Sequence, residues 1–223
     1  MPMHGGTMSM MWMRMPGQSW PGTAASFLAM WVAMMAAMML PSLGPMLWRY
    51  HESARRTHGA HVNGRTALVG AGYFAVWAAI GAFVFPVGAA IEYLTTQQPT
   101  LARVAPIVAG AAVLLAGVLQ HTKWKARQLA FCRDSAARDH GHAAWRHGVR
   151  LGLSCVRSCA GLTAAGLVIG AMDLRVMAVV TAAITVERLA PSDERVARAI
   201  GDAVVVAGLV LLARAVGFGA QGL

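Results

Sequence analysis

The sequence is poor in charged residues, and the shortage extends along the whole chain. Of its 223 residues, 13% are Asp, Glu, Lys or Arg and 57% are hydrophobic, whereas an average soluble domain has about 25% charged residues. The apolar residues form several separate blocks, which is typical of a polytopic membrane protein and not of a soluble domain with one anchor. Because these blocks fill almost the entire length, we predict one membrane domain.

Cysteine is also scarce, and the signatures of several enzyme classes are missing. The three cysteines, Cys132, Cys155 and Cys159, are odd in number, which argues against a disulfide framework. The sequence has no glycine-rich phosphate loop and no His-Glu-x-x-His motif. The N-terminus lacks the order of charge, apolar core and cleavage site that marks a signal peptide. Because the catalytic motifs named above are missing, a membrane enzyme is the least favoured function.

Acidic residues are few, with nine Asp and Glu against nineteen Lys and Arg, so the formal net charge is +10. Such a charge suits nucleic acid, but no recognised binding motif accompanies it, and we expect no nucleic-acid partner. In a membrane protein, Arg and Lys collect in cytoplasmic loops and set the topology. The positive charge is thus interpreted as a topology signal in a lipid bilayer.

Six apolar blocks predict an all-α fold, a polytopic transmembrane helix bundle of about six spans. The spans cover approximately residues 24–46, 66–91, 104–119, 151–171, 176–189 and 199–213.

Orientation follows from the basic residues, which crowd three segments between the predicted spans. These segments become cytoplasmic loops near 48–65, 121–150 and 188–198. Strict alternation then places both termini outside, in a bacterial cytoplasmic (inner) membrane. Residues 1–23 form a Met-rich periplasmic tail, and residues 24–223 form a single transmembrane helical domain.

Methionine is abundant in the first span, where no ionisable residue occurs from Gln18 through Trp48. Met34 and Met38 lie one helical turn apart, and Met35 and Met39 form a second row beside them. Thioethers are soft, uncharged ligands that suit Cu(I). Methionine is also a flexible apolar residue that fills helix contacts, so both interpretations stay open.

Cysteine appears twice in the fourth span, where Cys155 and Cys159 stand four residues apart on one helix face. Such a pair can hold a soft ion if another element adds ligands, although buried cysteines also act as small apolar residues. Further ligands could come from the second cytoplasmic loop. We predict a metal site drawn from Met34, Met38, Cys155, Cys159, Cys132, His147 and His121, with copper as the first candidate ion.

Two acidic residues, Glu187 and Asp202, lie about one turn from the cytoplasmic ends of their spans. Ionisable groups at membrane depth are costly and often functional. A salt bridge to Arg188, Arg198 or Arg157 is the alternative, and the role of both residues stays open.

The order of the motifs resembles a known family. The motifs occur along the chain in a fixed order. They are Trp31-x-x-Met34-x-x-Ala37-Met38-Met39-x-Pro41-Ser42, then Tyr73 with Trp77, then Lys125 through Cys132-Arg133, then His147-Gly148-x-x-x-Gly152-x-x-Cys155, and finally Glu187-Arg188 before Pro191. Over about Trp31 to Pro191, the chain resembles an uncharacterised bacterial family of predicted metal-binding integral membrane proteins. The resemblance implies a membrane protein with a metal link, but no reaction.

The chain departs from that family's pattern at two places where the family carries more cysteine. Gln128 stands at the first cysteine of the loop motif, and Ser158-Cys159-Ala160-Gly161 replaces a Gly-Cys-Cys-Trp run. Half of the thiols in the pattern are therefore missing.

Two functions of different classes follow from the sequence. The first is metal binding or homeostasis, with copper collected by the outside methionines, passed along Met34 and Met38, and received by Cys155 and Cys159. The alternative is a structural or assembly subunit of a membrane protein complex. In that case the Met and Gly faces pack helices, and the basic loops dock a soluble or membrane partner protein.

Overall fold

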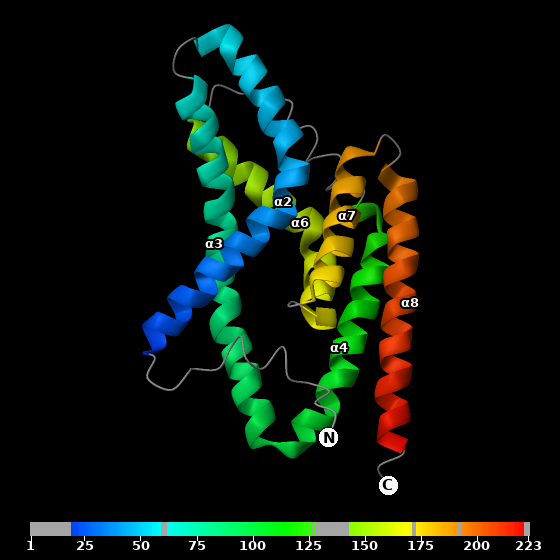
Figure 1. The fold of residues 1–223 in the computed structure, drawn as a ribbon. Coiled ribbons are helices and arrows are strands. Elements are labelled where there is room, and N and C mark those ends of the chain that lie inside the picture. The colour runs from blue at the N-terminus through cyan, green and yellow to red at the C-terminus, as the bar shows by residue number, and fades with distance from the viewer. Residues whose placement is uncertain are drawn as a thin grey trace.

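The structure is a computed structural model, and it describes residues 19–58, 62–125, 127, 143–170, 173–190 and 193–220. These ranges hold helices and no strand, so the all-α prediction is confirmed (Figure 1). The helices are α2 (Trp20–His58), α3 (Val62–Gln97), α4 (Pro99–Gln120), α6 (Ala144–Gly170), α7 (Leu174–Leu189) and α8 (Asp193–Ala220). Most of the predicted Met-rich tail and Cys132 lie outside the described residues.

Five of the described helices, α2, α3, α4, α6 and α8, are long and apolar enough to cross a membrane. Their outer faces carry large apolar side chains such as Phe83, which is 71% exposed, and Leu115 and Val206. Five such helices are compatible with a multi-pass membrane protein. The predicted fifth span corresponds to α7, which has 16 residues, about 24 Å of helix against a hydrocarbon core of about 30 Å. The count of six spans stays a prediction.

The helices extend beyond the predicted spans, because helical hydrogen bonding does not stop where the apolar sequence stops. In α2, Arg49 and Arg55 still belong to the helix, so much of the segment 48–65 is helical. In the same way α6 begins at Ala144 and includes His147, which was predicted to lie in a loop.

Close helix contacts depend on glycine, as the sequence indicates. A Cβ added to Gly148 of α6 would clash with the carbonyl oxygen of Val69 in α3. On α4, a Cβ at Gly117 would lie 2.7 Å from the backbone nitrogen of Val205 in α8. Figure 1 shows α4 and α8 side by side along much of their length.

The main core lies between α2, α3, α6 and α7, and it contains the first-span signature. Trp31 of α2 donates its indole N–H to the carbonyl of Trp77 in α3, at 2.9 Å. Its ring lies over Gly81, where a Cβ would approach Trp31 Cδ1 to 2.5 Å. The Met35 and Met39 side chains are fully buried in the same core, so one row of methionines faces the protein interior.

Candidate metal site

Two thiols from one turn of α6 form the centre of the site. The sulfurs of Cys155 and Cys159 are 3.6 Å apart, and both side chains are buried. The four-residue spacing produces this arrangement, because residues at i and i+4 share a helix face. The sequence prediction that the two thiols lie together therefore agrees with the structure.

A third sulfur comes from Met39 on α2, whose Sδ lies 3.8 Å from the sulfur of Cys155. Metal–sulfur bonds of about 2.3 Å place sulfur ligands of one ion roughly 3.8 to 4.0 Å apart. The Cys155–Met39 distance lies at the lower end of that range, and the Cys155–Cys159 distance of 3.6 Å is slightly shorter. Among the described residues, no three His, Cys, Asp or Glu side chains are grouped to hold a metal. A site built here therefore consists of two thiols and a thioether, a ligand set that suits a soft ion such as Cu(I).

Two polar side chains approach Cys155 from other helices. The hydroxyl of Tyr73 on α3 donates to the Cys155 sulfur at 3.0 Å. Arg188 at the end of α7 donates from Nη1 to the same sulfur at 3.3 Å. Donors placed beside a sulfur stabilise the negative charge that it carries when it binds a metal as a thiolate.

Arg188 is held in place by α2. Its Nη1 also donates to Ser42 Oγ at 3.1 Å, and its Nη2 approaches Met46 Sδ at 3.7 Å. Ser42 in turn donates to the carbonyl of Met39, at 3.0 Å. The guanidinium thus joins α7 to α2 and α6 at the sulfur site.

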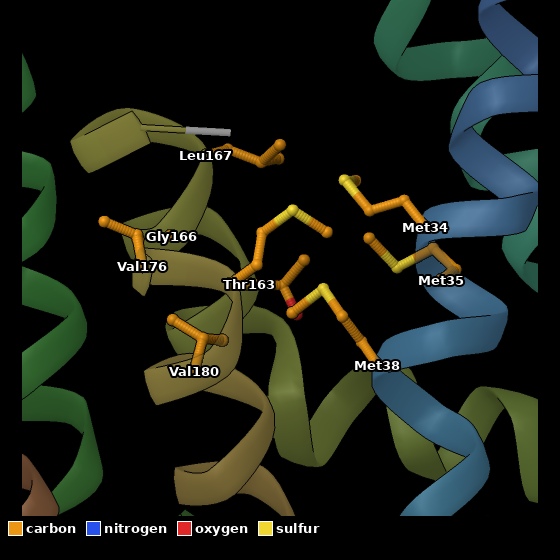
Figure 2. Close-up of a pocket in the computed structure, with 9 residues that line it drawn as sticks. Met34, Met35, Met38, Thr163, Gly166, Leu167, Val176 and Val180 are labelled. Atoms are coloured by element: carbon orange, nitrogen blue, oxygen red, sulfur yellow. The ribbon is translucent and has the colours of Figure 1, made fainter. Parts of the chain in front are cut away.

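The predicted ligands Met34 and Met38 lie in a separate cleft between α2, α6 and α7. Figure 2 shows Met34, Met35 and Met38 on α2 facing side chains of the other two helices. The cleft measures about 20 Å³, which is room for a single water-sized particle. Its lining is almost entirely apolar, and four of its residues are methionines: Met34, Met35, Met38 and Met177.

The predicted histidine ligands have other partners. His147 is buried on α6, two turns before Cys155, and its ring stacks on Tyr50 with centroids 5.3 Å apart. His121, which follows α4, lies 3.4 Å from the carboxylate of Asp202 on α8. The remaining predicted ligand, Cys132, is outside the described residues.

Glu187 is paired, but not with the arginines that the sequence suggests. Its Oε2 lies 2.9 Å from Lys125 Nζ, and its Oε1 accepts from Gln120 Nε2 at 2.6 Å. Lys125 also donates to the backbone carbonyl of Ser158, next to Cys159. All these side chains are buried, so the ion pair connects the end of α7 to the segment after α4 and to α6.

Sequence reasoning missed three residues of this site: Met39 as a neighbour of the thiols, Tyr73, and Arg188 as a donor. Tyr73 and Glu187-Arg188 did appear in the ordered motifs of the family resemblance. Periodicity does not reveal them, because each reaches Cys155 from a different helix.

Comparison with known proteins gives one family match. Residues 28–211 match the copper chaperone family PpoB2, whereas no curated protein and no solved structure matches the chain. The matched range contains all three site sulfurs and both donors. Because the match covers most of the chain, the protein belongs to the PpoB2 family of copper chaperones.

Proposed function

We propose that this protein handles copper within a membrane by holding Cu(I) between Cys155, Cys159 and Met39. The observation that carries the proposal is the buried group of three sulfurs contributed by α2 and α6. Thiolate and thioether ligands select soft ions, and membership of the copper chaperone family supports copper as the ion. Burial keeps water away from the bound ion.

The methionine cleft supports a path to that site. Met35 and Met39 form one row on α2, and Met34 and Met38 form the neighbouring row, so α2 carries thioethers from the cleft to the thiols. We propose that Cu(I) arrives from the Met-rich N-terminal tail, enters the cleft, and reaches Cys155 and Cys159. The six-span topology with both termini outside, in a bacterial cytoplasmic membrane, is part of this proposal.

A chaperone transfers its cargo, so the proposal includes a recipient. The copper chaperone family suggests a protein partner, and we propose a soluble or membrane protein that accepts Cu(I) from the thiol end of the path.

Elemental analysis of the full chain, purified anaerobically in mild detergent with Cu(I), tests the thiol site. We expect the wild type to retain copper with a thiolate-to-copper absorption band. Cys155→Ser/Cys159→Ser should lose the band, and Met39→Leu should weaken Cu(I) binding at least about tenfold, because one of three ligands is removed. Met30→Leu is the matched control, since Met30 is a partly exposed residue of the same helix.

Two outcomes would contradict the proposal. The band could persist in the double serine variant, or the wild type could retain no copper. In the second case, a stoichiometric partner that copurifies would favour the assembly subunit instead.

A further inference from the structure

Arg188 places a fixed positive charge inside the sulfur site. Its side chain is 4% exposed, and its guanidinium contacts the Cys155 sulfur, Ser42 and Met46. The preceding residue, Glu187, pairs instead with Lys125. Two neighbouring charged residues thus have separate roles, one in a buried ion pair and the other beside the thiols.

We infer that Arg188 shifts the preference of the site from divalent toward monovalent soft ions. This inference rests on the proposed Cu(I) site at Cys155 and Cys159. Lys125 and Glu187 also lie near Cys159, but they form an ion pair of zero net charge. Two thiolates and one guanidinium then leave a charge of −1, which one monovalent ion neutralises. A divalent ion leaves a net positive charge among these groups, and net charge is costly in a buried site.

The distances make this effect large. Arg188 Nη1 is 3.3 Å from the Cys155 sulfur, so an ion bonded to that sulfur at about 2.3 Å lies roughly 5 Å from the guanidinium charge. At that separation and an effective dielectric of about 20, repulsion by the guanidinium lowers the affinity for each additional positive charge on the ion by on the order of 100-fold, relative to a site with a neutral side chain in its place. Softness alone does not give this discrimination, because soft divalent ions also accept sulfur ligands.

The guanidinium shape fixes the charge in position. Arg188 uses Nη1 for the Cys155 sulfur and Ser42 and Nη2 for Met46, a fork that a lysine ammonium does not reproduce. Lysine does retain the charge. Arg188→Lys therefore separates the effect of charge from that of geometry.

The test compares Cu(I) and Cd(II), two soft ions that differ in charge, on the full chain in detergent. Affinities are measured by competition with chelators, and the near-ultraviolet thiolate-to-metal band is read with Cys155→Ser/Cys159→Ser as the blank. In Arg188→Gln and Arg188→Leu we expect the preference for Cu(I) over Cd(II) to fall by on the order of 100-fold. Arg188→Lys should retain most of the preference. Arg157→Gln is the matched control, because Arg157 is an exposed residue of α6 between the two cysteines.

The outcomes separate this inference from the proposed function. Equal weakening of Cu(I) and Cd(II) in the neutral variants would show a structural role and overturn the inference, as would an unchanged ratio. Arg188→Leu provides a second neutral variant if the glutamine variant does not give a monodisperse protein. A wild type that binds no Cu(I) would instead overturn the proposed function.

Discussion

Removing a single oxygen atom from Tyr73 tests the thiol site with little other change. The Tyr73 hydroxyl donates to the Cys155 sulfur at 3.0 Å in the buried core. Hydrogen bonds to charged groups contribute about 1.5–3 kcal/mol, and about 1.4 kcal/mol corresponds to a tenfold change in an equilibrium constant. Because the sulfur is a thiolate when it binds copper, Tyr73→Phe should weaken Cu(I) binding about 10- to 100-fold.

The assay is a competition between the purified protein and a Cu(I) chelator, read from the thiolate-to-copper band. Tyr50→Phe is the matched control, because the Tyr50 hydroxyl is buried but has no hydrogen-bond partner among the described residues. Folding of both variants is compared by size-exclusion chromatography and thermal unfolding. An unchanged Cu(I) affinity in Tyr73→Phe, with a normal fold, would refute the claim that this hydrogen bond supports the metal-bound thiolate.

Three further predictions concern the packing and the path. Lys125→Met leaves the buried Glu187 carboxylate without its cation, which should destabilise the protein by about 3–5 kcal/mol. In thermal unfolding, Lys125→Met/Glu187→Met should recover most of the lost stability. A double variant as unstable as the single one would contradict this prediction. Gly148→Val should force α6 away from Val69 and lower the unfolding temperature. Gly64→Ala should leave the unfolding temperature unchanged, because no atom lies within 4 Å of the added Cβ. Equal changes in unfolding temperature for the two variants would disprove the packing role of Gly148. Met34→Leu/Met38→Leu should alter the copper tolerance of cells and leave thiol-site binding in the purified protein intact, because Met-to-Leu changes conserve volume. Unchanged tolerance and unchanged cell copper content would remove the cleft from the path.

The sequence predicts local features of this protein well. Apolar blocks predict the helices, since length and hydropathy are local properties, and the four-residue spacing predicts that Cys155 and Cys159 share a face. Glycine patterns also predict close contacts, as Gly148 against Val69 illustrates.

The contacts between helices were less predictable. Glu187 and Arg188 are adjacent in sequence, yet one pairs with Lys125 and the other reaches Cys155. Which cation reaches which carboxylate depends on the rotation of each helix about its axis. Periodicity gives the apolar face of a helix but not its partner, so Met39 and Tyr73 were not assigned to the thiols.

The full burial of Cys155 determines the rates of loading and release as well as affinity. A side chain with 0% exposure has no contact with solvent, so an ion bound to its sulfur does not exchange directly with solution while the helices keep these positions. Dissociation then requires a helix to move, and the residence time of copper depends on how often the bundle opens. A chelator in solution would remove copper no faster than the bundle opens. A recipient protein that binds the open form would shorten the residence time of copper. Cargo retention by this protein is therefore as much a kinetic property as a thermodynamic one.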